Sequence, residues 1–123
     1  MRSVPSTQPD PGVVLSKATL SAAERLGLRS RQLARILGSS EASISRLQRG
    51  RDLEPSSKEG ELALLFLRLF RSLDALMGGD DDKARDWLTA PNRQFGVAPV
   101  ERIMTVEGLV DVVQYLDAMR GRL

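Results

Sequence analysis

The sequence contains neither cysteine nor histidine, and these two absences exclude many kinds of functional site in its 123 residues. Without cysteine, the chain can form no disulfide scaffold and offers no thiol nucleophile. Without histidine as well, it can build no Cys/His zinc site, no serine–histidine–aspartate triad and no imidazole acid–base catalyst. We therefore expect no metal ion and no cofactor, and an enzyme is the function class that the composition favours least.

Long apolar runs are also missing. No stretch approaches the roughly 20 consecutive apolar residues that a membrane-spanning helix needs. The opening segment MRSVPSTQPDPG lacks the apolar run of a secretory signal. We expect a cytoplasmic protein with no membrane partner.

Charge is nearly balanced over the whole chain but not along it. The 18 basic and 16 acidic side chains give a formal net charge of +2. Residues 1–55 carry nine basic and five acidic side chains, whereas residues 56–123 carry nine and eleven. Between Arg25 and Arg51 there are seven arginines and one acid, Glu41. Such a basic segment attracts a nucleic-acid backbone, although a solvated helical surface in an arginine-rich protein is the other interpretation.

The apolar spacing predicts an all-α protein with about seven helices, because no segment shows a convincing two-residue alternation. Residues 1–12 hold three prolines and few apolar side chains, which is typical of a disordered leader. The first helix is predicted from about residue 13 to residue 26. We divide the remaining chain into a helical domain at residues 13–54 and a second one at residues 55–123, with a long central helix joining them.

Several polar residues stand where helices should begin. Ser30 is predicted to cap the second helix and Ser40 the third, each before an apolar stripe. Ser56 and Glu59 have the spacing of a capping box at the start of the long central helix. Farther along, Thr105 is predicted to cap the last helix.

The run Asp80, Asp81 and Asp82 stands at the expected start of the fifth helix. Three neighbouring carboxylates could bind a metal ion. Helix capping and attraction to the positive end of the helix dipole explain them better. After this helix, Pro99 is well placed as the first residue of a short sixth helix.

The central helix is apolar on nearly all of its sides, which a single thin layer cannot bury. Two interpretations follow: the helix is the central spine between two halves of the chain, or one of its faces is a homodimer interface. We expect both to hold. A subunit interface of this kind uses the same surface on both copies. The residues predicted at that interface are Leu64, Leu67 and Phe70.

Residues 28–50, LRSRQLARILGSSEASISRLQRG, have the pattern of two short helices joined by a tight turn. Such a helix-turn-helix holds its second helix at a fixed angle, so that this helix can enter the major groove of DNA. The side chains expected to lock the two helices together are Leu33, Leu37, Ile44 and Leu47. The pattern resembles the Xre-type helix-turn-helix family of phage Cro and repressor-like proteins. The matching positions are Leu33-Ala34, Gly38, Ser40, Ile44-Ser45 and Arg49-Gly50.

The resemblance implies which side chains face DNA. Those expected on the groove-facing side are Ser40, Glu41, Ala42, Ser43 and Arg46, and those expected at phosphates are Arg29, Ser30, Arg49 and Arg51. Arg46 would bind guanine with two hydrogen bonds, and Ala42 would touch a thymine methyl group. Glu41 would either accept a hydrogen bond from a cytosine amino group or only stabilise the helix dipole.

Two positions depart from the family pattern. Ser30 stands where the family usually has a phosphate-binding glutamine, and Gln48 replaces the usual glutamate before Arg49-Gly50. One such domain offers few base contacts, so useful specificity needs two half-sites about one helical turn apart. That requirement agrees with the expected homodimer.

The C-terminal half resembles the toxin-binding domain of the Xre/MbcA/ParS antitoxins. The matching positions are Trp87-Leu88, Pro91-Asn92, Phe95-Gly96, Pro99, Glu101, Ile103, Thr105 and Glu107-Gly108. The resemblance implies a bacterial, dimeric antitoxin paired with a RES-domain toxin, which consumes NAD or transfers ADP-ribose from it. It also implies that the antitoxin binds double-stranded operator DNA and represses its own operon.

Two segments are candidate toxin contacts. The loop from Thr89 to Ala98 is long for so small a domain and combines an aromatic side chain with an arginine, which are types that dominate protein interfaces. The chain also ends directly after its last helix, so its tail could enter a cleft. The candidate toxin-binding residues are Pro91, Asn92, Arg93, Phe95, Arg120, Arg122 and Leu123. We hypothesise that loop and tail together cover the NAD site of the toxin. Core packing is the other interpretation for Phe95 and for Trp87.

Two other functions remain open at this point. A free-standing dimeric repressor would keep the helix-turn-helix and use the C-terminal half only to dimerise. A pure interaction module would have lost DNA binding, for which the acidic Glu41 and the missing glutamine at position 30 are the motives.

Overall fold

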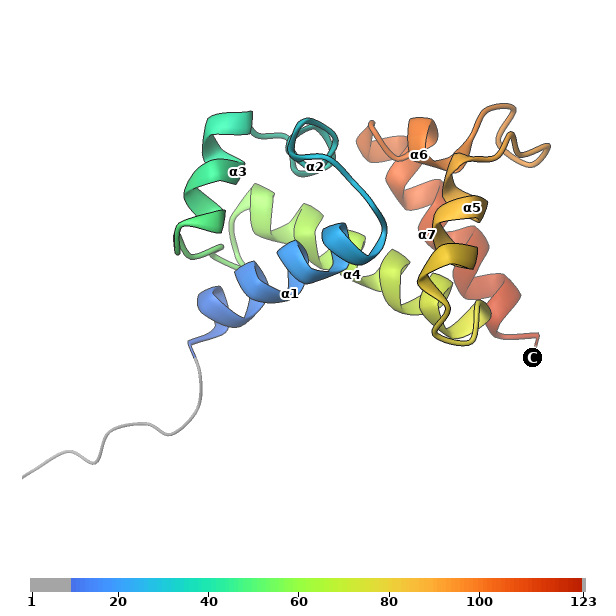
Figure 1. Cartoon of the computed structure of the whole chain (residues 1–123), viewed down its shortest axis with the longest axis horizontal. Helices are drawn as coiled ribbons and strands as arrows, with labels where there is room; N and C mark the ends of the chain where they lie inside the picture. Colours follow the sequence, from blue (N-terminus) through green and yellow to red (C-terminus); the bar gives the residue numbers. More distant parts are fainter. Residues whose placement is uncertain (1–9, 123) are drawn as a thin grey trace, which may run out of the picture.

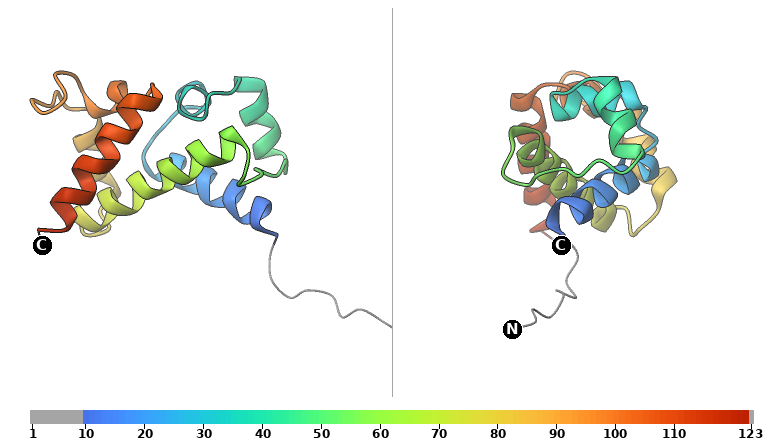
Figure 2. Two further views of the ribbon diagram at one scale, coloured as in Figure 1. Left: turned by 180° about the vertical axis from the view of Figure 1, so that it is seen from behind. Right: turned by 90° about the vertical axis from the view of Figure 1, so that its left-hand side faces the viewer.

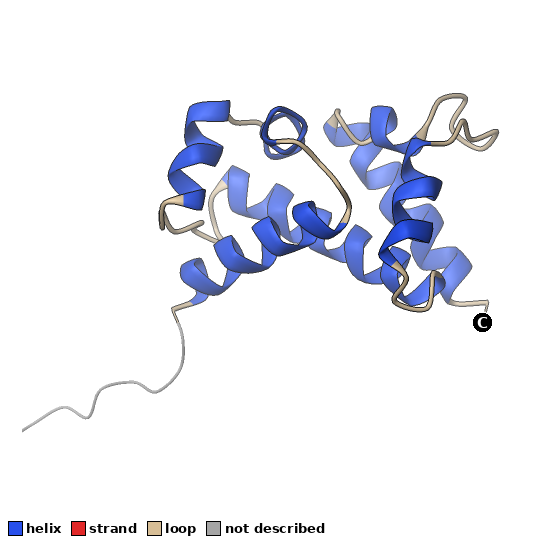
Figure 3. Cartoon of the chain, in the orientation of Figure 1, coloured by secondary structure: helices blue, strands red, loops and turns tan. Residues whose placement is uncertain are grey.

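The computed structural model describes residues 10–122, and this part of the chain is all-helical, as predicted (Figures 1 and 3). The predicted leader therefore lies outside the described residues at positions 1–9, and so does Leu123. The seven helices of the described part are α1 (Pro11–Arg25), α2 (Ser30–Leu37), α3 (Glu41–Gln48), α4 (Lys58–Leu76), α5 (Asp81–Thr89), α6 (Pro99–Arg102) and α7 (Val106–Arg120).

Helix α1 begins earlier than predicted. Asp10 is its N-cap, and the Asp10 side chain accepts a hydrogen bond from the backbone N–H of Gly12 at 2.8 Å. Pro11 suits the first helical position, because its φ is already helical and the N–H that it lacks would have no partner there. The Gly12 carbonyl then accepts from Leu53 N–H at 3.1 Å. Residues 10–12 thus form the N-cap and the start of α1 and do not belong to a leader.

Two predicted caps are displaced by one residue. The N-cap of α2 is Arg29 and not Ser30, because the Gln32 side chain accepts from Arg29 N–H at 2.9 Å. The N-cap of α4 is Ser57 and not Ser56, because Ser57 Oγ accepts from Gly60 N–H at 3.0 Å. The predicted capping box is therefore wrong. The caps at Ser40, Asp80 and Thr105 are confirmed.

Helix α4 is the spine of the molecule. It packs against α1 and α2 with one part of its length and against α5 and α7 with the other (Figures 1 and 2). This confirms the predicted central position and explains why α4 is apolar on most of its sides. The α4 side chains buried most completely are Ala63, Phe66, Leu69 and Leu73.

Only one of the three predicted dimer residues is well exposed. Leu64 is 48% exposed, whereas Leu67 is 6% exposed. Helix α1 packs on α4, and Leu15 of α1 lines the same surface groove as Leu64 and Leu67. Phe70 is half-buried, and the guanidinium carbon of Arg25 lies 4.8 Å from the centre of its ring. Leu67 is thus a core residue, and Phe70 is partly covered within the chain.

Charged contacts join the C-terminal end of α1 to the C-terminal half. Arg25 binds Asp74 of α4 at 2.9 Å and Asp81 of α5 at 3.0 Å. The two carboxylates, Asp81 foremost, raise the pKa of the Arg25 guanidinium above its ordinary value. Arg85 of α5 donates to the Arg25 carbonyl at 2.9 Å. The first three helices are therefore fastened to the C-terminal half at the level of α4 and α5.

Candidate functional sites

Helices α2 and α3 form the predicted helix-turn-helix. Gly38 ends α2 with a φ of +65°, a left-handed conformation that glycine adopts at little cost. The turn then reaches Ser40, the N-cap of α3. The four apolar side chains predicted to lock the pair are each at most 2% exposed; they are Leu33, Leu37, Ile44 and Leu47. The orientation of α3 is therefore fixed by a packed core.

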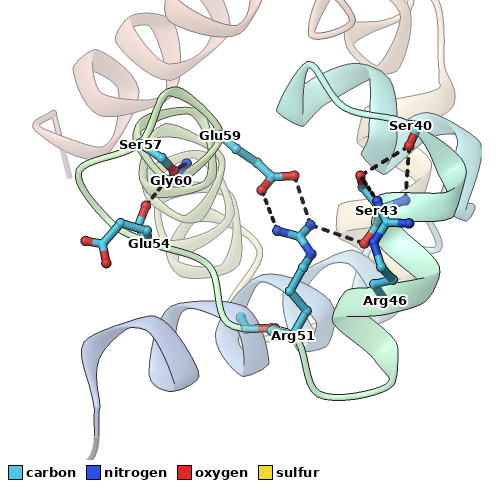
Figure 4. Close-up of polar contacts among 9 residues, drawn as sticks. Ser40, Ser43, Arg46, Arg51, Glu54, Ser57, Glu59 and Gly60 are labelled. Atoms are coloured by element: carbon cyan, nitrogen blue, oxygen red, sulfur yellow. Dashed lines mark hydrogen bonds and ion pairs between the residues drawn. The ribbon is translucent and has the colours of Figure 1, made fainter.

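The predicted base-reading residues share one outward face of α3. Ser40, Glu41, Ala42 and Arg46 are exposed, and Ser43 is half-buried. Ser40 Oγ accepts from Ser43 N–H at 3.1 Å, and Arg46 Nη2 donates to Ser43 Oγ at 2.9 Å (Figure 4). The structure brings these residues together as the sequence suggested. Their contacts to bases stay a prediction.

The predicted phosphate contacts divide into two groups. Arg29 and Arg49 are exposed, and Ser30 is half-buried at the start of α2, where Gln48 Nε2 lies 3.5 Å from its hydroxyl oxygen. Arg51 differs, because its guanidinium binds both oxygens of Glu59 on α4, at 2.9 and 3.1 Å. The half-buried Arg51 is therefore bound to α4 through Glu59, a residue that the sequence analysis assigned to a helix cap.

The ion pair also fixes the charge state of Glu59. Hydrogen bonding to Arg51 lowers the pKa of the Glu59 carboxyl below its ordinary value, although partial burial opposes this shift. Glu59 is thus ionised at neutral pH and neutralises Arg51. The positive charge exposed on α2 and around α3 comes instead from Arg29, Arg31, Arg35, Arg46 and Arg49.

Comparison with protein families accounts for both halves of the chain. A model of the antitoxin Xre-like helix-turn-helix domain matches residues 7–68, which is half of the chain. The chain belongs to the Xre-like antitoxin family. A second model, of the antitoxin Xre/MbcA/ParS C-terminal toxin-binding domain, matches residues 72–122. No curated protein matches the sequence. Both matched domains are regulatory, so the protein is an antitoxin with a DNA-binding domain and not an enzyme.

The two family models meet within α4. The helix that forms the spine of the antitoxin therefore contributes to both domains. The division at residues 54 and 55, which places all of α4 in the C-terminal domain, stays a prediction. Within residues 10–122, no helix is long and apolar enough to span a membrane, and no acidic cluster has the arrangement of a metal site.

Three aromatic rings anchor the loop of the toxin-binding domain. Phe95 packs edge-on against Trp87 of α5 at 6.3 Å and against Tyr115 of α7 at 5.3 Å. The rings of Trp87 and Tyr115 are stacked at 6.4 Å. All three are half-buried against the core. Phe95 thus holds the loop in place, and core packing accounts for much of its surface. The sequence analysis missed Tyr115, whose role depends on its contacts with Trp87 and Phe95 from other segments.

The loop itself presents polar and apolar groups to solvent. The Asn92 side chain accepts from Gln94 N–H at 2.8 Å, and the Asn92 carbonyl accepts from Gly96 N–H at 2.9 Å. Pro91 and Arg93 are exposed beside this turn. Sequence reasoning also missed two exposed apolar side chains that flank α6, Val97 at 40% and Val106 at 59% exposure.

The loop and the tail lie toward opposite ends of α7 (Figures 1 and 2). Arg120 and Arg122 are exposed at the C-terminal end of α7, and the loop leads into α6 near the other end. Phe95 of the loop nevertheless packs against Tyr115 of α7, five residues before Arg120. The hypothesis that loop and tail together cover the NAD site of the toxin stays a prediction, and Leu123 lies outside the described residues.

Proposed function

We propose that this antitoxin neutralises a RES-domain toxin and represses its own operon by binding operator DNA. The single observation that carries the proposal is the presence of both antitoxin domains, matched over residues 7–68 and 72–122, in one chain. The type of toxin follows from the family resemblance. A RES-domain toxin acts on NAD, so an antitoxin can neutralise it by covering the active site, without chemistry of its own.

Toxin binding is proposed at both ends of α7. The exposed guanidinium groups of Arg120 and Arg122 can pair with carboxylates in an active-site cleft. The loop around Arg93, with the exposed Val97 and Val106 beside it, offers a second contact to a large partner. Charge reversal at Arg120 and Arg122 separates the two contacts: it should abolish neutralisation, even if the toxin still binds through the loop.

DNA binding is proposed through the exposed face of α3. Arg46 is the proposed guanine contact, and Arg29, Ser30 and Arg49 are the proposed phosphate contacts. Two copies are needed to read two half-sites. We propose that they pair through the apolar patch where the exposed Leu64 of α4 lies near Val14 of α1, each being 48% exposed.

Co-expression with the neighbouring reading frame, as the proposed source of the toxin, tests this function. We expect growth and cellular NAD to recover relative to cells expressing the toxin alone, and a heteromeric complex to be purified and sized by light scattering. A lone dimer with no rescue would contradict the antitoxin function. It would favour the free-standing repressor instead, which operator footprinting would then test.

A further inference from the structure

Arg51 lies directly after α3, where three helices meet (Figure 4). Its backbone N–H donates to the Arg46 carbonyl in the last turn of α3 at 2.9 Å. Its carbonyl accepts from Ser16 Oγ of α1 at 3.0 Å. Its guanidinium reaches Glu59 on α4 at 2.9 Å. One residue thus contacts α1, α3 and α4.

The guanidinium of Arg51 also contacts α3, the helix predicted to face DNA. Arg51 Nη2 donates to Glu59 Oε2 at 3.1 Å and to the Ser43 carbonyl of α3 at 3.2 Å. Ser43 in turn accepts from Arg46 Nη2 through its hydroxyl oxygen at 2.9 Å. A continuous chain of contacts therefore runs from Glu59 on α4 through Arg51 and Ser43 to Arg46, the predicted base-reading residue.

The Arg51–Glu59 ion pair is partly shielded from solvent, which favours a single geometry. The side chains of Arg51 and Glu59 are 31% and 19% exposed, and both carboxylate oxygens are engaged. A charged pair with two hydrogen bonds is stronger and more directional than a single surface contact. If Arg51 turned outward to a phosphate, the half-buried Glu59 carboxylate would lose its partner, which is costly.

We propose that Arg51 is a positioning residue, which together with Glu59 sets the recognition helix α3 against α4, and that it is not a phosphate contact. This inference rests on the proposed binding of DNA by α3. Arg51 and Glu59 act on recognition through Ser43 and Arg46, because the Arg51 guanidinium is bound to Glu59 and to the Ser43 carbonyl.

The two roles predict opposite effects of Glu59→Gln. If Arg51 bound a phosphate, the substitution would release the cation and strengthen DNA binding. If Arg51 positions α3, the substitution should weaken specific binding, as Arg51→Met does. The matched control is Glu61→Gln, which removes the same charge from the same turn of α4, where Glu61 pairs only with Lys58 among the described residues. The control therefore measures the general gain from losing one negative charge.

The DNA experiment compares the full-length variants on a duplex carrying the operon's own promoter and on a duplex of random sequence. We expect Arg51→Met and Glu59→Gln each to lower affinity for the promoter roughly tenfold relative to Glu61→Gln, with an unchanged salt dependence. The double variant should be no weaker than either single variant, because the two residues act as one unit. The proposal would be overturned if Glu59→Gln bound the promoter more tightly than Glu61→Gln. It would also be overturned if Arg51→Met alone reduced the slope of log affinity against log salt concentration by about one.

Hydrogen exchange of the free protein gives a readout that needs no DNA. We expect the α3 amides to exchange several times faster in Glu59→Gln than in Glu61→Gln, while the α7 amides stay unchanged. Equal α3 exchange in the two variants would contradict the positioning role. If the wild type binds neither duplex, the proposed DNA-binding function fails, and the exchange comparison still decides whether this pair holds α3.

Discussion

The two surfaces proposed to bind partners are built in different ways. On α3, the outward side chains are short or charged, and they are hydrogen-bonded to one another through Ser40, Ser43 and Arg46. At the α6 end of the toxin-binding domain, three packed aromatic rings hold a loop, and exposed valines flank it. The first surface depends on the angle of one short helix, and the second depends on the shape of a packed loop. The same mutation should therefore harm only one of them, unless it disturbs the frame that they share.

Two helices of the scaffold that carries both surfaces, α4 and α7, begin in the same way. Ser57 and Thr105 cap α4 and α7, and each accepts a hydrogen bond from a buried glycine three residues later. At both glycines a backbone carbonyl lies where a Cβ atom would be, the Glu54 carbonyl at Gly60 and the Arg102 carbonyl at Gly108. Each helix start is thus pressed against the segment before it, and only glycine leaves the necessary space.

Replacing these two glycines by alanine should have the largest effect on stability. Because both helices carry the scaffold, both binding surfaces should lose their function together. We expect Gly60→Ala and Gly108→Ala each to lower the free energy of unfolding by about 3 kcal/mol, because the obstructing atoms belong to the backbone and cannot turn aside. Urea unfolding measures this loss. Gly121→Ala is the control, since its Cβ would lie 3.5 Å from the nearest atom. Equal stability of all three variants would contradict the close approach.

Arg46→Ala should impair the DNA surface alone. A guanine contact with two hydrogen bonds contributes about 1–3 kcal/mol, so affinity for the operator should fall by one to two orders of magnitude while toxin binding is retained. Fluorescence anisotropy with the promoter duplex measures the loss. Lys83→Ala, which removes the same charge from α5, is the control. A similar loss in both variants would mean that Arg46 contributes only charge.

Phe95→Ala should impair the toxin surface alone. Removing the half-buried ring leaves Trp87 and Tyr115 without their edge-on partner and should cost about 1–2 kcal/mol of stability. Calorimetric titration with the toxin should show weaker binding, whereas operator affinity should not change. Unaltered toxin binding would show that the aromatic anchor is structural only.

Leu64→Glu should change the assembly more than the fold. Because Leu64 is 48% exposed, a charge there should cost little stability in the single chain, but it should separate the proposed dimer. Light scattering of the purified antitoxin would then show a monomer. Ala75→Glu, an exposed position on the same helix, should leave the dimer intact. A dimer in both variants would exclude this patch as the interface.

The smallest expected effect is the pH dependence of the Arg51–Glu59 pair. The folded pKa of Glu59 is below its ordinary value, so the pair stabilises the fold above the unfolded carboxyl pKa of about 4.3. This contribution, about 1 kcal/mol or less, should disappear as the pH falls through the folded pKa. The stability difference between wild type and Glu59→Gln should therefore shrink below about pH 4. A constant difference down to pH 2 would contradict the ion pair.

The sequence predicted the elements better than the contacts between them. Apolar spacing, together with the capping residues, prolines and glycines at helix ends, predicted all seven helices of the described part. The same spacing predicted the buried contact between α2 and α3, which consists of Leu33, Leu37, Ile44 and Leu47. Helix starts were misplaced where neighbouring serines compete, as at Ser56 and Ser57, because the cap depends on a backbone geometry that the composition does not reveal.

The contacts around the candidate site residues could not be predicted from the sequence, for a common reason. Arg51 looked like one more cation in a basic segment, since nothing in the sequence signals its pairing with Glu59 at the start of another helix. Leu67 was assigned to the dimer interface, whereas its burial within the chain depends on how α1 packs on α4. The placement of loop and tail depends on the direction of α7 and on the packing of Phe95 against Tyr115, which the sequence does not reveal (Figure 1). Local patterns predict which side chains are exposed or buried on one helix, but not what lies opposite them.

The central claim is that one antitoxin carries two separable binding surfaces. It is tested most directly by measuring promoter repression and rescue from the toxin in the same cells, for Arg46→Ala and for the charge reversal of Arg120 and Arg122. We predict that the first variant loses repression and keeps rescue, and that the second loses rescue and keeps repression. Loss of both activities in either variant, at wild-type protein levels, would contradict the account.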